Sequence, residues 1–292
     1  MGGGELKELH QVTTIGKISY TNAWPMYHYF EPAALTNPAE LVTEVPARLN
    51  ERIHEGSLDL SAMSSFAYGM ASDRLLLLPD ISVSSRGEVK SILLFSKEPI
   101  ESIVNRTIAL TNTSATSVNL LKVIMTKFYE GNPDYITMEP ELESMMENAD
   151  AALLIGDHAI KASWADHDYY VYDLGELWYR YTGHQMTYAV WAVNRSYADN
   201  NGDAVKEIAD AFYSSKTASL RDLAPVVKHA VQHIGGSEAY WYAYFRNLVY
   251  DFGENELQGL QLYFRYAHEL GLMEHEVQVD LWNENKLIRV TE

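Results

Sequence analysis

The sequence contains no cysteine, which excludes disulfide bonds, thiolate nucleophiles and metal sites built on cysteine. Basic residues are also few, because 22 Lys and Arg stand against 40 Asp and Glu and give a formal net charge of −18. Such a surface repels nucleic acids and anionic lipids, which are bound by basic patches. We therefore expect neither a nucleic acid nor a membrane as a partner, and an anionic ligand would have to be held by local groups.

Long hydrophobic runs are absent as well. No apolar stretch approaches the ~20 residues that span a bilayer, and the first residues lack the apolar core of a signal peptide. These features predict a cytoplasmic protein. The sequence also lacks the motifs of phosphate loops, dinucleotide sites, zinc peptidases and serine hydrolases, and its ten His residues show no reliable metal-ligand spacing. We therefore expect no metal and no cofactor.

The chain does have enough apolar residues for a large core, since 47% of its 292 residues are hydrophobic. Helical periodicity occurs between short apolar runs, for example over 46–56. This alternation predicts an α/β fold with mostly parallel sheets. The apolar runs predict strands at 14–19, at 74–80 with an end at Pro79, and at 90–96, 105–111, 149–156 and 187–194.

The order of these segments predicts two lobes. The strand at 90–96 leads into a new series of strands and helices, and the strand at 187–194 leads into a tail that is helical almost throughout after Gly202. The chain would then cross between the lobes twice. We predict a discontinuous lobe one of residues 10–97 plus 191–292, and a lobe two of residues 98–190.

Two Ser-rich turns precede helix-like segments, one in each predicted lobe. They are SAMSSFAYG at 61–69 and TNTSATSVNLLKV at 111–123. One hydroxyl suffices to cap a helix, and the second turn has four, at Thr113, Ser114, Thr116 and Ser117. Ordinary capping explains either turn alone. As a pair they also predict two anion cradles that face each other, which would suit a small dicarboxylate.

Three further positions stand at the ends or starts of predicted strands. Asn22 lies in the loop of ISYTNAWPMY after the first strand, where open α/β sheets bind ligands, although Asn is also an ordinary turn residue. Ser91 begins the strand at 90–96. Asp157 follows the strand in LLIGDHA, where it is placed to cap the next helix.

The motifs occur in an order that resembles one known family, the menaquinone-biosynthesis chorismate dehydratases. The resemblance covers residues 14–194 and extends to the helical tail, and it is carried by ISYTNAWP, EVPARLN, GSLDLSAMSSFAYG, LLLLPDISVSSRGEVKSILLFS, SATSVNLL, ALLIGDHA, YDLGELW and TYAVWA. It implies a two-lobed periplasmic-binding-protein-like (type 2) fold with an interlobe cleft and a helical C-terminal segment. It also implies a lyase that converts chorismate into 3-[(1-carboxyvinyl)oxy]benzoate and water, the first step of the futalosine route.

The resemblance implies roles for particular residues. Asn22 and Ser91 would be catalytic at the C4 hydroxyl that leaves the substrate. Asp157 would contact the substrate and is one candidate for the base, the other being the enolpyruvyl carboxylate of chorismate itself. His158 stands where the family often has a small residue, which affects the shape of the cleft. The two carboxylates of the substrate would be bound by Ser64 and Ser65 in lobe one and by Ser114, Thr116 and Ser117 in lobe two.

Two alternatives share the implied fold. One is a non-catalytic binding protein for a small carboxylate, since the fold alone does not determine activity. The other is the sister enzyme 1,4-dihydroxy-6-naphthoate synthase, whose sequences open with a Ser-Pro-Cys-Pro-Asn type of segment, whereas this chain has no Cys. A sensor domain of a transcription regulator is disfavoured, because no basic helix-turn-helix accompanies it. The sequence leaves the oligomeric state open.

Overall fold

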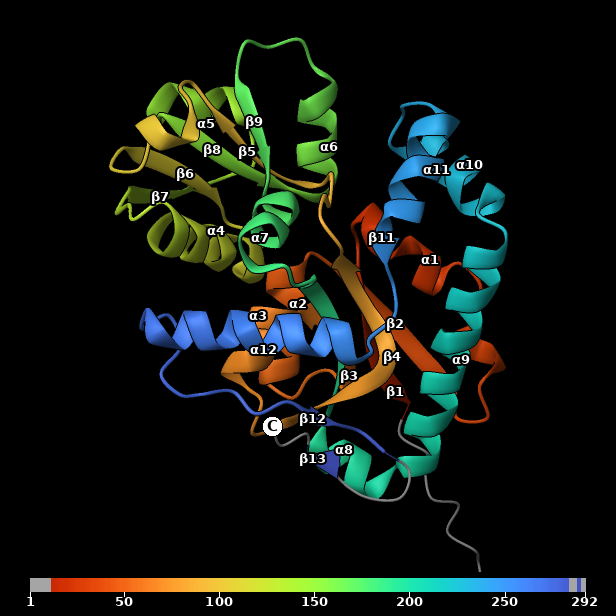
Figure 1. Ribbon diagram of the computed structural model, residues 1–292. Coiled ribbons are helices and arrows are strands. Elements are labelled where there is room, and N and C mark those ends of the chain that lie inside the picture. The colour runs from red at the N-terminus through yellow and green to blue at the C-terminus, as the bar shows by residue number, and fades with distance from the viewer. Residues whose placement is uncertain (1–11, 284–287, 290–292) are drawn as a thin grey trace, which may run out of the picture.

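In the computed structural model, residues 12–283 and 288–289 are described, and their strands form two sheets (Figure 1). The larger sheet has the order β13-β12-β4-β10-β3-β1-β2, with β11 paired to β4, and the smaller has the order β7-β6-β8-β5-β9. The larger sheet contains β1 (Thr13–Ile18), β2 (Ala39–Glu44), β3 (Leu60–Ser64), β4 (Leu75–Ser85), β10 (Met186–Asn194), β11 (Leu248–Val249), β12 (Asp280–Leu281) and β13 (Ile288–Arg289). The smaller contains β5 (Ile92–Ser96), β6 (Thr107–Thr111), β7 (Asp134–Met138), β8 (Ala151–Ile155) and β9 (Tyr170–Asp173).

Helices surround both sheets, and within the described residues none is long and apolar enough to cross a membrane. The smaller sheet carries α4 (Ala115–Phe128), α5 (Leu142–Asn148), α6 (Gly156–Trp164) and α7 (Leu174–Thr182) (Figure 1). The remaining helices are α1 (Trp24–Tyr27), α2 (Pro46–His54), α3 (Ser65–Met70), α8 (Arg195–Asn200), α9 (Gly202–Arg221), α10 (Ala224–His233), α11 (Glu238–Asn247) and α12 (Glu254–Glu269), with short 3-10 turns η1 (Thr21–Ala23), η2 (Pro32–Ala34) and η3 (Ile100–Ser102). The predicted α/β fold is confirmed.

The predicted end of the second strand at Pro79 is wrong. The strand β4 continues to Ser85, and its pairing with β10 shifts register between Leu77 and Ser82. Asp80 lies inside this shift with a φ of 62°. Because the ladder is already interrupted there, the missing N–H of Pro79 breaks no regular strand pairing.

The sheets are mixed rather than mostly parallel. Strands β1, β2 and β3 pair in parallel, as do β6, β7 and β8. However, β10 runs antiparallel to both β3 and β4, and β5 runs antiparallel to β8 and β9. The chain enters the smaller sheet at β5 and returns to the larger sheet at β10. Each of these two strands comes from the other sheet, so it runs opposite to its neighbours.

The chain crosses between the sheets earlier than the lobe boundaries that we predicted. Strand β5 pairs in the smaller sheet and β10 in the larger one. If each sheet marks a lobe, the crossings lie between Ser85 and Ile92 and between Asp173 and Met186, rather than at 97/98 and 190/191. The division into two lobes remains a proposal, and its residues 10–11, 284–287 and 290–292 lie outside the described part of the chain.

The largest hydrophobic cluster runs through both sheets. It includes Trp191 in the larger sheet, Leu49 on α2 beside it, and Leu153 and Ile108 in the smaller sheet, all with no exposed surface. The strands β3, β5 and β8 are buried along their whole length. The two halves therefore pack against each other, and polar groups buried where they meet must find partners there.

Candidate functional site

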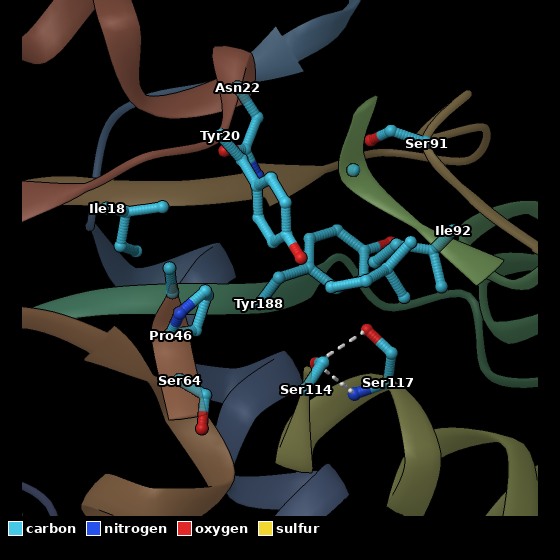
Figure 2. Close-up of a pocket in the computed structure, with 13 residues that line it drawn as sticks. Ile18, Tyr20, Asn22, Pro46, Ser64, Ser91, Ile92, Ser114, Ser117 and Tyr188 are labelled. Atoms are coloured by element: carbon cyan, nitrogen blue, oxygen red, sulfur yellow. Dashed lines mark hydrogen bonds between the residues drawn. The ribbon is translucent and has the colours of Figure 1, made fainter. Parts of the chain in front are cut away.

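A cavity lies where the two sheets meet, with about 420 Å³ of empty space that is partly open to solvent. Its lining comes from β1, β3 and β10 of the larger sheet and from β5 and β8 of the smaller one. No lining residue is charged. The lining consists of Ile18, Tyr20, Asn22, Pro46, Ser64, Ser91, Ile92, Ser114, Ser117, Ile155, Gly156, Tyr188 and Ala189 (Figure 2).

Four helices begin at this cavity. Pro46 opens α2, Ser64 caps α3, Ser114 caps α4 and Gly156 opens α6. The N-terminus of a helix carries a partial positive charge and unpaired N–H groups. Their convergence favours an anion in a cavity that has no basic side chain. The sequence pointed to the helices at Ser64 and Ser114, whereas α2 and α6 join them only in the folded chain.

Ser64 has a hydrogen to offer a ligand. Its hydroxyl oxygen accepts the N–H of Ala67, at 3.3 Å, and the side-chain amide of Asn50, at 3.2 Å. The carbonyl oxygen of the Asn50 side chain in turn accepts the Ser64 N–H. Since the hydroxyl accepts both bonds, its own hydrogen remains available for donation.

Ser114 and Ser117 form a similar pair in the first turn of α4 (Figure 2). The Ser114 oxygen accepts the Ser117 N–H at 3.2 Å, as expected of a helix cap, and the Ser114 hydroxyl donates to the Ser117 hydroxyl at 3.1 Å. The hydrogen of Ser117 is therefore left over. The cap thus presents a hydroxyl donor to the cavity from the smaller sheet's side.

Asn22 lies in η1, directly after β1 and before the Pro25 of α1. Its backbone carbonyl accepts the hydroxyl of Tyr250 at 3.0 Å, which holds the turn in place. Its side-chain oxygen is buried without a hydrogen-bond partner. A buried amide oxygen is costly to leave unpaired, so this group is placed to accept a hydrogen bond from a ligand.

Ser91 is buried at the entry to β5 and is held from two sides. Its hydroxyl accepts the hydroxyl of Tyr244 at 2.9 Å and donates a long bond of 3.4 Å to the Val89 carbonyl, which a ligand oxygen can replace. The Ser91 carbonyl accepts the N–H of Gly156 at 2.7 Å. Burial raises the pKa of Tyr244 well above its ordinary value, so this phenol stays a proton donor. Tyr244 therefore polarises and orients Ser91, and it was not among the predicted site residues.

Ser65 and Thr116 do not line the cavity. The Ser65 hydroxyl donates to the carbonyl of Thr187 at 2.8 Å and lies 3.2 Å from the Thr116 hydroxyl, while Thr116 accepts the Phe66 N–H at 3.0 Å. The Thr116 carbonyl accepts the hydroxyl of Tyr263. Both hydroxyls therefore join α3 to α4 across the two sheets. The structure gives no support to the predicted contact of Ser65 and Thr116 with a substrate carboxylate.

Asp157 also lies outside the cavity lining. It sits in the first turn of α6 and accepts the backbone N–H of Thr21 at 3.3 Å, which links the two sheets next to Asn22. Burial raises the pKa of its carboxyl group. His158 follows it and faces a different, outer pocket. The structure thus gives Asp157 a contact between the halves and no direct access to the cavity.

The outer pocket has about 940 Å³ of empty space and is more open. It is lined by the start of α2 and by the loops that precede α4 and α5 in the smaller sheet's half. Tyr20 belongs to its lining and to that of the inner cavity. The other residues of the outer pocket are Val45, Ala47, Arg48, Glu51, Asn112, Thr113, Glu139, Pro140, Glu141 and His158.

Two aromatic side chains of the inner cavity were missing from the predicted set. The Tyr20 ring extends into the cavity, and Tyr188 lies below it on β10 (Figure 2). Tyr188 is anchored by a hydrogen bond of 2.8 Å between its hydroxyl and that of Ser85. The signal for Tyr20 was available, since it stands two residues before Asn22 in the same loop. Tyr188 gave no such signal within its apolar strand.

Within residues 12–283, no group of three or more His, Asp or Glu side chains is arranged to hold a metal ion. The inner cavity offers hydroxyls, one amide and helix N-termini. Such groups bind oxygen atoms of an organic anion by hydrogen bonds. The chemistry of this donor set therefore suits a small carboxylate.

Comparison with known proteins gives a family and a fold. A family model described as menaquinone biosynthesis matches residues 13–269. A chorismate dehydratase of Thermus thermophilus is 32% identical over 273 residues, which cover 88% of this chain and 95% of that protein.

Among solved structures, a protein from Archaeoglobus fulgidus superposes with a TM-score of 0.75 at 17% identity, over 91% of this chain and all of that one. The periplasmic aliphatic sulphonate binding protein SsuA of Escherichia coli gives a TM-score of 0.66 at 15% identity, over 91% of this chain and 95% of that one. These likenesses confirm the periplasmic-binding-protein-like fold.

Proposed function

Since the chain belongs to the menaquinone-biosynthesis family, we propose that it is a lyase that dehydrates chorismate to 3-[(1-carboxyvinyl)oxy]benzoate. The relative from Thermus thermophilus supports this assignment, because its name is chorismate dehydratase and it matches nearly its whole length. The reaction would be the first step of the futalosine route to menaquinone. The cytoplasmic location of such an enzyme is part of the proposal.

The observation that carries the proposal is the cavity of neutral donors between four helix N-termini. Chorismate has two carboxylates, and the cavity has free hydroxyl hydrogens from opposite sheets, at Ser64 and Ser117. In this arrangement Ser64 binds one carboxylate, and the pair of Ser114 and Ser117 binds the other. The helix dipoles supply the positive potential that the missing basic side chains would otherwise give.

The reaction removes a proton from C3 and the hydroxyl from C4, and it needs no change of oxidation state. The electron pair of the broken C–H bond delocalises into the ring carboxylate, which is vinylogous to C3. That charge then forms the new ring double bond as the C4–O bond breaks, and the oxygen leaves with a proton as water. Because the product ring is aromatic, the overall step is downhill, and the protein must mainly orient the substrate and stabilise charge.

Asn22 and Ser91 act on the leaving oxygen in this proposal. Both line the same cavity, and Figure 2 shows them at the same end of it. Ser91 is oriented by Tyr244 at 2.9 Å, so its hydroxyl is fixed before the substrate binds. Fixed donors that meet developing negative charge lower the barrier more than mobile ones, since they need no reorganisation.

We assign the removal of the C3 proton to the enolpyruvyl carboxylate of the substrate itself. Asp157, the protein candidate, is engaged with the backbone of Thr21 and does not line the cavity. No other carboxylate belongs to the lining. The proton would pass from C3 to the substrate carboxylate and finally to the departing oxygen, which balances the reaction without a protein base.

A binding protein without catalytic activity is the second candidate. It is favoured by the shared fold with the sulphonate-binding protein, because a cavity of helix N-termini also suits an anion that is only held. The sister synthase of the same pathway would act on a different ring system.

The test is to incubate the purified protein with chorismate, without added metal or nucleotide, and to separate the products by chromatography. A peak of the enolpyruvyl benzoate that grows with enzyme concentration is the expected result. Unchanged chorismate would reject the dehydratase. Calorimetric binding of chorismate without turnover would then support the receptor or the sister enzyme.

A further inference from the structure

The inner cavity and the outer pocket are separated by a thin wall. Consecutive residues line one or the other at two places: Pro46 against Val45 and Ala47, and Ser114 against Thr113. At these places the backbone itself forms the partition. Tyr20 is the only described residue that belongs to both linings, so its ring is the part of the wall that a side-chain rotation can move.

Tyr20 reaches from one half of the molecule to the other. It follows β1 of the larger sheet, and its ring lies on Gly156 at the start of α6 in the smaller sheet's half. A Cβ at Gly156 would come within 2.9 Å of the ring, so only glycine allows this contact. Gly156 also has a φ of 57°, which disfavours other residues.

The hydroxyl of Tyr20 has no partner with good hydrogen-bond geometry, although the side chain is only 6% exposed. Burial raises the pKa of this phenol, and a weak interaction with the Thr113 side chain offsets only part of that rise. In Figure 2 the hydroxyl points toward the middle of the cavity residues, on the side of Ser114 and Ser117. A buried hydroxyl without a partner loses its bond to water and gains nothing in return. That loss is recovered when a ligand oxygen accepts the hydrogen.

We propose that Tyr20 is a gate between the outer pocket and the inner cavity, and that its hydroxyl binds a substrate carboxylate once the gate has closed. The ring provides the gate, since it lies against Gly156 and lines both pockets. The hydroxyl provides a further bond that stabilises the closed position when a ligand is present. The gate is independent of the identity of the ligand, whereas the carboxylate contact rests on the proposed function.

The gate is tested without any ligand, because the chain has no cysteine and a single thiol can be introduced. Ser117→Cys places this thiol in the cavity, at a position that is 2% exposed. We expect Tyr20→Ala to raise the rate at which iodoacetamide alkylates the thiol by about tenfold or more. A tenfold rise corresponds to a change of about 1.4 kcal/mol in the free energy of gate opening. Tyr20→Phe keeps the ring and should leave the rate within about twofold of that in the Ser117→Cys parent.

Two controls separate gating from general loosening. An exposed thiol from Ser57→Cys should react at the same rate with and without Tyr20→Ala. Tyr135→Ala removes another tyrosine with an unpartnered buried hydroxyl, on β7 and outside both pockets, and should leave the cavity thiol protected. Equal protection in the Tyr20→Ala and Tyr20 backgrounds would overturn the gate. A rise in alkylation at both thiol positions, 117 and 57, would also overturn it.

The hydroxyl is tested by the steady-state kinetics of Tyr20→Phe with chorismate. We expect KM to rise about tenfold with kcat nearly unchanged, because a hydrogen bond to a carboxylate is lost equally from bound substrate and transition state. An unchanged KM would reject the carboxylate contact. If the wild-type protein neither binds nor converts chorismate, this contact falls with the proposed function, and the alkylation rates still decide the gate.

Discussion

At the residue scale, the site is defined by polar groups that the protein leaves without partners. The side-chain oxygen of Asn22 and the hydroxyl of Tyr20 are both buried and unpaired in the cavity. Ser65 and Thr116 are equally buried, but their hydroxyls bond to each other and to the backbone. The distinction between a ligand-binding and a structural hydroxyl therefore lies in its partners and not in its burial.

Asn22→Ala tests the group that we assign to the leaving oxygen. Turnover should fall by about a hundredfold or more, because the side-chain amide of Asn22 would no longer bind and orient the leaving hydroxyl. The free energy of unfolding should change little, because the side-chain oxygen has no partner to lose. Product formation from chorismate and urea unfolding of the same preparation measure the two quantities.

Asn119→Ala is the matched control for Asn22→Ala. Asn119 is partly buried in α4, and its amide donates to the Ala115 carbonyl within the same helix, outside the cavity. Its loss should leave turnover near the wild-type value. Turnover of the Asn22 variant within about threefold of the wild type, against the expected loss, would remove Asn22 from the mechanism.

Much of the candidate site could be read from the sequence, but not the contacts that select its members. Asn22 was predicted in the loop after a strand, Ser91 at the start of a strand, and Ser64, Ser114 and Ser117 in the Ser-rich turns. All five line the cavity. The partner that orients Ser91 lies 153 residues away, and the one that holds the Asn22 backbone lies 228 residues away. No local pattern encodes such pairs, so the sequence could not distinguish Ser65 from Ser64.

At the scale of single elements, the first turn of α6 is informative because an acid is buried there. Burial raises the pKa of Asp157 above its ordinary value, so folding favours the protonated form. Ionised Asp157 therefore costs folding free energy, and the cost is absent below its unfolded pKa of about 3.9. As pH rises, the cost appears and reaches its full size above the raised folded pKa.

Asp157→Asn removes this cost while its side-chain oxygen can still accept the Thr21 N–H. The variant should be more stable than the wild type at pH 7, and the difference should vanish near pH 3 as the wild-type carboxyl group becomes protonated. Urea unfolding at both pH values measures it. Asp157→Ala also loses the Thr21 bond, so it should gain less than Asp157→Asn at pH 7.

The same variant decides the proton acceptor. If the substrate carboxylate takes the C3 proton, Asp157→Asn should retain turnover within about tenfold of the wild type, which is less than the loss of a general base causes. A drop of more than a thousandfold in a folded variant would restore Asp157 as the base. It would also require the carboxylate to leave Thr21 during the reaction.

Three of the strands that sequence reasoning missed share a physical property. Strands β2, β7 and β9 are half-exposed and lie at sheet edges, so they lack the continuous apolar runs of β5 and β8. Strand direction was missed for another reason. The antiparallel entry of β5 and β10 depends on how the chain passes between the sheets, which hydrophobic periodicity does not record.

At the scale of the whole molecule, the charge opposes the proposed substrate. The chain has a formal charge of −18, and chorismate carries two carboxylates. The outer pocket does not reverse this field, because Glu51, Glu139 and Glu141 accompany Arg48 and His158 in its lining, and Arg48 is already paired with Glu51. The attraction by helix N-termini acts only inside the cavity, within the reach of one helical turn.

The rate of substrate capture should therefore rise with salt, which is opposite to the usual behaviour of a steered enzyme. The Debye length shortens from about 30 Å at 0.01 M to about 8 Å at 0.15 M, so added salt screens the repulsion along the approach. We expect kcat/KM to increase about two- to fivefold over this range while kcat stays constant, since the chemical step occurs inside the cavity, away from the surface charge. Initial rates at low and saturating chorismate separate the two parameters.

The charge of the outer pocket can be tested apart from that of the whole surface. Glu141→Gln removes one negative charge from the lining of the outer pocket. Its control, Glu55→Gln, removes one negative charge at the C-terminal cap of α2, outside that lining. If the substrate enters through the outer pocket, the first variant should raise kcat/KM at 0.01 M salt more than the second, and the difference should disappear at 0.15 M. Equal effects of the two variants would mean that the net charge alone governs substrate capture. If kcat/KM of the wild type fell with salt, local cations would attract the substrate.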